Sequence, residues 1–214
     1  MRTEFGGGIP PVLGGSPVAV PAIPNLRMAG RAVAKVVHRC QDANENQNLD
    51  LSECQLMQMP DGVYHLMRNT VVLTCNLSYN VIQKIPAKFT IKFSNITELN
   101  LSNNQLNSLP EELEDLRELQ RLDISSNHYH ALPKVVFRLR PLKIFNAAKN
   151  YIAEVDVERL TTLPDLQEVN FENNPLCKSS YDQFQHLGRI RVHLSAFQPE
   201  DFEDLMDLDE EGQA

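Results

Sequence analysis

Two histidines with one residue between them have the spacing that could begin a metal site. His128 and His130 flank Tyr129, and both imidazoles would need a third ligand to complete a site. No cysteine and no further histidine lies near them in the sequence. We therefore expect two solvated loop histidines, with no metal and no other cofactor.

The four cysteines also lack the spacing of a chemical site. They show neither a C-x-x-C pattern nor the clustering that zinc or a disulfide framework requires, since they stand at Cys40, Cys54, Cys75 and Cys177. A reduced, intracellular environment accounts for isolated thiols of this kind. The cysteines therefore favour a cytoplasmic protein.

The common catalytic and phosphate-binding motifs are missing from the sequence. None of G-x-x-x-x-G-K-[ST], G-x-G-x-x-G, G-x-S-x-G or H-E-x-x-H occurs. The paired carboxylates Glu111 and Glu112 fall in a segment that we expect on a convex helix, away from any cleft. We therefore predict that the protein is not an enzyme.

The charge of the chain is concentrated at its C-terminal end. The 214 residues carry 20 Lys and Arg against 28 Asp and Glu, for a net charge of −8. Residues 200–211 hold eight of the acids and no base, which leaves 20 of each sign elsewhere. The basic surface typical of nucleic-acid binding is therefore not expected. No apolar run reaches the roughly 18 residues of a membrane span, so we predict neither a nucleic-acid nor a membrane partner.

An internal repeat dominates the middle of the chain. Its frame, L-x-x-L-x-L-x-x-N-x-L-x-x-L-P, is complete in residues 96–110. Five further copies fit with substitutions, and the ninth position of the six copies is held by Cys54, Asn80, Asn104, Asn127, Asn150 and Asn174. These anchors lie between 23 residues (104 to 127) and 26 residues (54 to 80) apart.

The spacing of the frame has a direct physical explanation. The L-x-L pair alternates with a period of two, so its leucines point inward from a short strand. The asparagine follows where the chain must turn, and its amide can pair backbone groups that would otherwise be buried without partners. One repeat cannot bury its own apolar face, so stability comes from stacking neighbouring repeats.

This frame resembles that of the leucine-rich repeat proteins, in particular their intracellular, Ras-suppressor-like class. Extracellular members carry cysteine clusters at both ends, and this chain does not. The resemblance implies a small binding module without catalysis, and it supplies no ligand residues. We predict an α/β solenoid with a curved parallel β-sheet on its concave face and short helical or 3-10 segments on its convex face.

Four regions follow from the composition. We predict a disordered Gly/Pro-rich leader at 1–27, a capping helix at 28–46, six repeats with a last strand at 47–195, and an acidic disordered tail at 196–214. The capping helix places Val33, Val36, Val37 and Cys40 on one stripe. Met28 could serve as an alternative start of translation.

The concave face is the predicted binding surface, because its outward positions carry no packing constraint. A mixed patch on the fourth and fifth repeats combines bases, amides and one apolar side chain. With the second repeat's tyrosine, the candidate residues are Tyr79, Arg121, Asp123, Ile144, Asn146 and Lys149. Ile144 is the most unusual of them, since an outward isoleucine has no packing role unless a partner covers it. A plain solvated surface is the alternative, and we expect a monomer.

The acidic tail supports a second hypothesis. Phe202, Leu205 and Met206 recur at helical spacing among the acids, as in short motifs that fold on binding. The protein would then regulate a basic partner, such as a histone or a ribonucleoprotein. The basic stretch 134–149 could attract an acidic partner or this tail, or it could be solvated convex charge.

Overall fold

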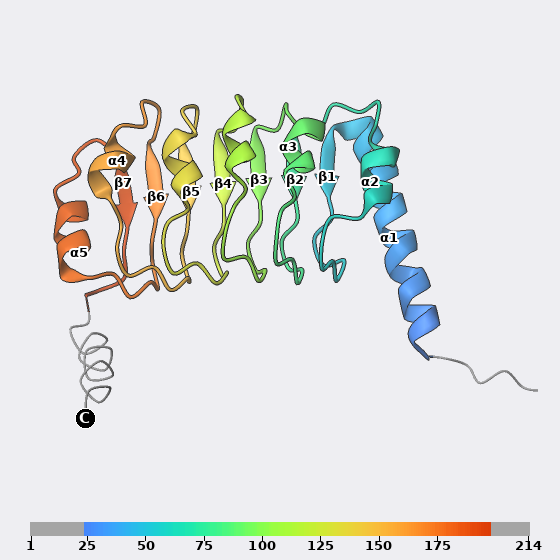
Figure 1. The fold of residues 1–214 in the computed structure, drawn as a ribbon, viewed down its shortest axis with the longest axis horizontal. Helices are drawn as coiled ribbons and strands as arrows, with labels where there is room; N and C mark the ends of the chain where they lie inside the picture. Colours follow the sequence, from blue (N-terminus) through green and yellow to red (C-terminus); the bar gives the residue numbers. More distant parts are fainter. Residues whose placement is uncertain (1–23, 198–214) are drawn as a thin grey trace, which may run out of the picture.

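Seven short parallel strands form one continuous sheet along the concave side of the molecule (Figure 1). The computed structural model describes residues 24–197. The strands follow one another in sequence order, each in register with the next. They are β1 (Asn48–Asp50), β2 (Thr74–Asn76), β3 (Glu98–Asn100), β4 (Arg121–Asp123), β5 (Ile144–Asn146), β6 (Glu168–Asn170) and β7 (Arg191–His193).

The period-two pattern of the frame determines which strand residues are buried. The middle residue of each of the first six strands is buried, and these residues are Leu49, Cys75, Leu99, Leu122, Phe145 and Val169. Their neighbours on either side face the concave surface. The buried side chains join into one core that runs from Val36 to Ile190. The predicted curved parallel sheet is confirmed.

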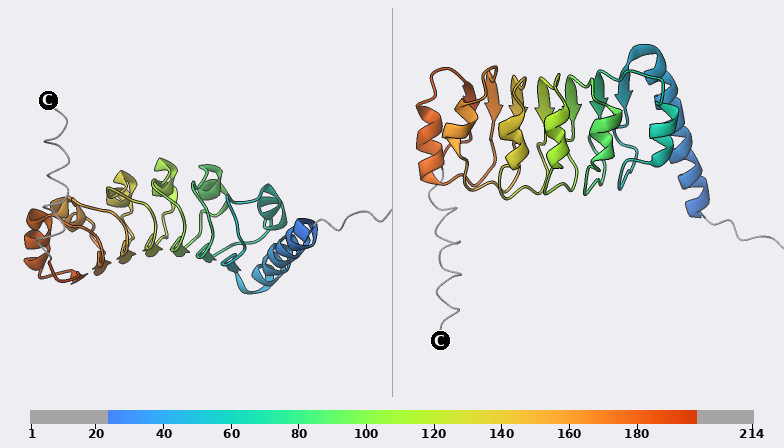
Figure 2. Two further views of the ribbon diagram at one scale, coloured as in Figure 1. Left: turned by 90° about the horizontal axis from the view of Figure 1, so that it is seen from below. Right: turned by 45° about the horizontal axis from the view of Figure 1, so that its top comes forward.

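Short helices cover the opposite face of the sheet (Figure 2). They are α2 (Asp61–Leu66), α3 (Lys88–Lys92), η1 (Glu111–Asp115), η2 (Lys134–Arg138), α4 (Val157–Thr161) and α5 (Lys178–Gln185). The apolar residues of 111–119 and of 134–142 recur at helical spacing, but in each segment only the first five residues form a 3-10 helix. Each follows a proline at its N-cap, Pro110 or Pro133, whose extended backbone separates the helix from the preceding turn.

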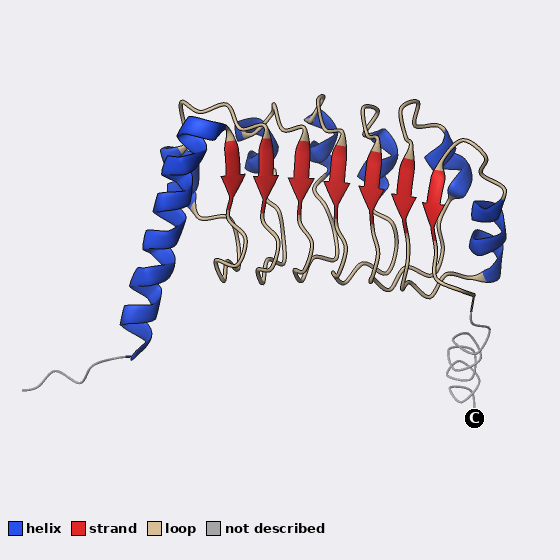
Figure 3. Cartoon of the chain, turned by 180° about the vertical axis from the view of Figure 1, so that it is seen from behind, coloured by secondary structure: helices blue, strands red, loops and turns tan. Residues whose placement is uncertain are grey.

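A long helix, α1 (Pro24–Asn46), packs against the free side of β1 (Figure 3). It begins four residues before the predicted start at 28, because proline is well tolerated in the first turn of a helix. Val36 and Cys40 are buried as the stripe predicts, whereas Val33 is 64% exposed. The Arg39 guanidinium donates to the backbone oxygens of Asp50 (3.0 Å) and Ser52 (2.6 Å), which ties the helix to the first strand.

The repeat asparagines form a ladder of hydrogen bonds inside the turns. The Asn80 Nδ2 donates to the carbonyls of Leu51 (2.9 Å) and Leu77 (2.8 Å), and its Oδ1 accepts from the amides of Cys54 (3.0 Å) and Leu56 (2.9 Å). Each asparagine therefore joins two consecutive repeats. Equivalent bonds recur at Asn104, Asn127, Asn150 and Asn174.

The two ends of the chain differ in how far the structure describes them. The last strand, β7, covers residues 191–193, where Ile190, Val192 and Leu194 alternate with Arg191 and His193, and α5 closes the sixth repeat before it. The predicted leader before residue 24 and the predicted tail after residue 197 lie outside the described residues.

Candidate binding surface

A shallow groove of about 560 Å³ runs across the concave face from β1 to β6. In-register pairing stacks its outward side chains into two rows. The first row consists of Asn48, Thr74, Glu98, Arg121, Ile144 and Glu168, and the second consists of Asn76, Asn100, Asp123, Asn146 and Asn170. Four of the predicted residues, Arg121, Asp123, Ile144 and Asn146, therefore lie together in this groove.

The second row has a structural role that the sequence analysis missed. Each of its side chains accepts a hydrogen bond from the backbone amide two residues later, as in an Asx turn. The Asp123 Oδ1 accepts from the Ser125 amide at 2.8 Å, and the Asn146 Oδ1 accepts from the Ala148 amide at 3.1 Å. The Asn146 Nδ2 also donates to the Asp123 Oδ2 at 2.9 Å. These two side chains are held in place before any partner binds.

The first row places one apolar side chain between charged ones. Ile144 stands in register between Arg121 on β4 and Glu168 on β6. The Arg121 Nε lies 3.6 Å from the Glu98 Oε1, and the Glu168 carboxylate contacts Arg191 at 3.0 Å and His193 at 3.2 Å. Because both neighbours are engaged by ion pairs, Ile144 is the apolar centre of a polar, self-paired surface.

Tyr79 and Lys149 lie at the edge of the groove and do not line it. Both occupy the turn position just before the ladder asparagine, with φ of 55° at each. Asn103, Ser126 and Asn173 hold the same left-handed conformation in other repeats. Tyr79 belongs to the second repeat and Lys149 to the fifth, so the structure does not bring these two predicted residues together. The asparagines at this position, Asn103 and Asn173, could have indicated the left-handed conformation from the sequence, because asparagine adopts it more readily than most residues.

Exposed apolar side chains gather at the N-terminal end of the solenoid, another feature that the sequence analysis missed. Within the described part of the chain, eight of the nine large exposed ones precede residue 92. Leu73 stands at a repeat position that the later copies fill with polar residues, Thr97, Gln120, Lys143 and Gln167, and Val81 at one that the next two copies fill with Gln105 and His128. These differences from the later repeats could have indicated the exposed apolar surface from the sequence alone.

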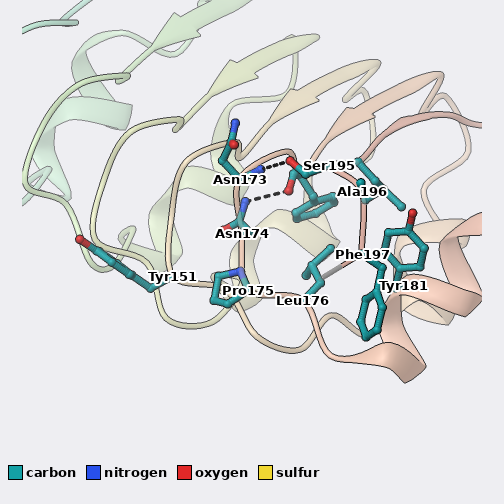
Figure 4. A pocket seen from close by; sticks show the side chains of 11 residues that line it. Tyr151, Asn173, Asn174, Pro175, Leu176, Tyr181, Ser195, Ala196 and Phe197 are labelled. Carbon is teal, nitrogen blue, oxygen red and sulfur yellow. Dashed lines mark hydrogen bonds between the residues drawn. The ribbon is translucent and has the colours of Figure 1, made fainter. Parts of the chain in front are cut away.

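A second pocket, of about 410 Å³, lies at the C-terminal end (Figure 4). Aromatic side chains line it, and the rings of Tyr181 and Phe197 lie 5.3 Å apart. The Asn173 backbone amide donates to the Ser195 Oγ at 2.8 Å and fixes the segment that follows β7 to the sixth repeat. Tyr151, which also lines the pocket, is 53% exposed.

The exposed His130 stacks on Tyr151, and the exposed His128 contacts the same ring at a tilted angle. Their ring centroids lie 6.2 Å and 5.3 Å from that of Tyr151. Within residues 24–197, no group of three or more His, Cys, Asp or Glu side chains could hold a metal ion. These histidines therefore act as aromatic surface in the described part of the chain.

Cys40, Cys54 and Cys75 are held in the thiol form by burial. Burial, with a smaller contribution from nearby Cys54, raises the pKa of Cys40 to about 11. Burial likewise raises the pKa of Cys54 and of Cys75. Because the thiolate is the nucleophile and the metal ligand, these three side chains are poor candidates for either role at neutral pH.

The geometry of the concave groove supports recognition of a partner by shape and hydrogen bonding.

None of the helices between residues 24 and 197 has both the length and the apolar character needed to cross a bilayer.

Comparison with known proteins agrees with this architecture. The family model described as "Leucine-rich repeat region" matches residues 71–207. The chain belongs to the leucine-rich repeat family. It is similar to mouse leucine-rich repeat-containing protein 20, with 39% identity over 155 residues that cover 71% of this chain and 84% of the mouse protein. The human protein of the same name is 34% identical over 99 residues, which cover 44% of this chain and 54% of that protein.

Solved structures of leucine-rich repeat proteins share the fold. A leucine-rich repeat protein of Leptospira interrogans superposes with a TM-score of 0.57 at 26% identity, covering 64% of this chain and 34% of that one. TLR13, solved in a complex with ssRNA13, superposes with a TM-score of 0.58 at 19% identity, covering 70% and 21%. At that identity the second likeness concerns the fold alone.

Proposed function

We propose that this protein is a non-enzymatic, cytoplasmic scaffold or adaptor that binds a protein partner in the concave groove. The observation that carries the proposal is Ile144, an apolar side chain on a groove floor whose other outward residues are polar and largely paired with one another. The family supports a protein-interaction role in general. The patch formed by Arg121, Asp123, Ile144 and Asn146 is the proposed contact centre.

The rigidity of this patch supports the proposal. Asp123 and Asn146 are fixed by bonds to their own backbone and to each other, so binding loses little side-chain entropy there. A partner that covers Ile144 with an apolar side chain gains burial without breaking the adjacent ion pairs. Tyr79 and Lys149 would contact only a partner that extends beyond the groove. The rows carry three acids and one base, and this negative balance favours a protein over nucleic acid. We propose that the chain works as a monomer.

Proximity labelling in cells tests the proposal with matched double variants. Arg121→Glu with Ile144→Asp places two acids in the groove. Ile91→Asp with Arg117→Glu makes the same chemical changes on the convex side, where both side chains are exposed. We expect the concave variant to lose its labelled partners by about tenfold or more, while the convex variant keeps them and both unfold near the wild-type midpoint. Retained labelling with the concave variant would refute the groove as the binding surface.

The acidic tail carries the alternative, a regulatory protein that acts on a basic partner. Eight acids between residues 200 and 211 favour it. Binding through the tail would weaken steeply with salt, because exposed charges are screened within about 10 Å at 0.1 M ionic strength. Deleting residues 199–214 would abolish it, whereas partners held by the groove would remain.

A further inference from the structure

An apolar groove of about 360 Å³ opens at the N-terminal end of the solenoid, away from the concave face. It lies between α1, the loop after the first strand and α2. Its walls include Val33 and Val37 from α1, Leu56 from the loop, and Val63 and Leu66 from α2. None of its lining residues carries a charge. Val33 is 64% exposed and Leu66 is 42% exposed, so the groove presents apolar surface.

The floor of this groove has room for a further side chain. A Cβ atom added at Gly62, which also lines the groove, would meet nothing within 4 Å. An uncharged apolar cleft of this kind favours an occupant with small aliphatic side chains and no charge, because an ion placed there would lose its hydration without gaining a partner.

The chain itself contains such a segment directly before α1. Residues 5–23 carry no charge, and residues 17–23 read PVAVPAI. Proline fixes φ and favours an extended chain, which lowers the entropy lost on docking. Seven such residues span about 22 Å, whereas Pro24 and Val33 are about 14 Å apart along the helix. The segment is therefore long enough to turn back at Pro24 and reach the groove.

The apolar motif of the C-terminal tail follows β7 too closely in the sequence to reach this groove. The six strand spacings between β7 and β1 amount to about 29 Å, and the groove lies roughly 10 Å further along. Met206 follows Phe197 by nine residues, which extend at most about 32 Å. The acids around Phe202 and Leu205 would also enter a cleft without a basic side chain.

We propose that residues 17–23 dock as an extended segment in the groove between α1 and α2 and cover its apolar surface. A chain that starts at Met28 lacks this segment and leaves the groove open. The two starts would then produce the same solenoid with and without an apolar docking site at its N-terminal end. This proposal is independent of the function proposed for the concave face.

Photo-crosslinking in the full-length chain tests the contact. We would replace Leu66, in the wall of the groove, with p-benzoylphenylalanine and map the products by mass spectrometry. The control is the same replacement at Ile91, which is 79% exposed on α3. We expect crosslinks from position 66 to residues 17–23 of the same molecule, with a yield independent of protein concentration, and none to that segment from position 91. Crosslinks from position 66 to the tail or to a second copy would overturn the proposal. A yield to residues 17–23 no higher than that from position 91 would also overturn it.

Two substitutions separate docking from folding. Gly62→Leu fills the groove floor, and Val20→Asp puts a charge into the segment. Each is expected to lower the position-66 crosslink about tenfold. Gly62→Leu replaces a glycine in a helix and should not lower the unfolding midpoint. An unchanged crosslink yield in either folded variant would contradict docking in this groove.

Discussion

In the repeats that contain Asn104, Asn127 and Asn150, a buried amide bonds the backbone of two consecutive turns. In the first repeat the same position holds Cys54, which makes one long contact from its Sγ to the Ser52 carbonyl at 3.4 Å. The central repeats have one left-handed residue in each turn, whereas the first has two, Glu53 and Gln55. The N-terminal end also carries most of the exposed apolar side chains and the groove beside α1.

The difference shows how one frame yields both a rigid scaffold and an open surface. Where the asparagine is present, the turn is closed by its own hydrogen bonds and the concave rows pair among themselves. Where the frame departs from its consensus, the surface offers apolar area that nothing in the described residues covers. We therefore propose that function divides between the preorganised concave patch and the apolar N-terminal groove.

The largest expected effect comes from removing one step of the ladder. Asn127→Ala leaves the buried Leu106 amide without a partner and removes one of the two side-chain bonds to each of the Leu101 and Ile124 carbonyls. We expect it to lower the free energy of unfolding by about 3 kcal/mol, measured by urea denaturation. Cys54→Ala, which removes a buried thiol but no ladder bond, should cost about 1 kcal/mol. If Asn127→Ala and Cys54→Ala lower the free energy of unfolding equally, the asparagine ladder does not make the central repeats more rigid than the first.

Alkaline pH should destabilise the N-terminal end. The folded pKa of Cys40 is about 11, above its ordinary value of 9.0, because burial disfavours the thiolate. The folded chain therefore binds more protons than the unfolded chain, and its stability falls as pH rises from about 9 to about 11. Denaturation at several pH values should show a loss of about 2 kcal/mol attributable to this thiol. The free energy of unfolding should depend less on pH in Cys40→Ala than in Cys177→Ala. The same pH dependence in both variants would show that the Cys40 thiol is not responsible.

A smaller effect is expected from relieving the left-handed turn in the fifth repeat. Lys149→Asn keeps φ at a value that asparagine adopts readily, and should raise the free energy of unfolding by about 0.5–1 kcal/mol. Asn103→Lys in the third repeat should lower it by a similar amount. Thermal unfolding of the pair checks the prediction. If Lys149→Asn lowers the free energy of unfolding, or if Asn103→Lys raises it, the turns of the two repeats are not equivalent.

The smallest effect is expected at the surface ion pair of the concave row. Glu98→Gln removes the partner of Arg121, but both side chains are about half exposed. The change in the free energy of unfolding should be below about 0.5 kcal/mol and should vanish at high salt. A larger loss would mean that the concave rows stabilise the solenoid, which would weaken their assignment as a surface kept for binding.

Much of the architecture was predictable because the frame couples pattern to packing. The apolar residues of the L-x-L pair determine strand and core in every copy, and the ninth-position asparagines determine the turn in the second to sixth copies. The start of α1 was placed too late, because Pro24 was assigned to the leader although proline fits a first helical turn. The convex helices are shorter than their apolar spacing suggests, since each must end in time for the next strand.

The binding surface was less predictable because outward positions are not all free. Asp123 and Asn146 were chosen as unconstrained polar residues, yet their oxygens close Asx turns, a role that Asp and Asn at a strand end could have indicated. The left-handed conformation of Lys149 was hidden because a lysine there gives no local signal. The apolar groove depends on α1, the first loop and α2 meeting in space, which no single segment reveals.

Hydroxyl-radical footprinting of the chain, free and bound to the partner recovered by proximity labelling, tests the central claim most directly. Side-chain oxidation reports solvent access residue by residue. The account predicts that oxidation of Ile144 and its neighbours in the groove falls on binding, while that of Ile91 and Tyr151 is unchanged. Protection of Ile91 with Ile144 still fully reactive would contradict the concave face as the binding surface.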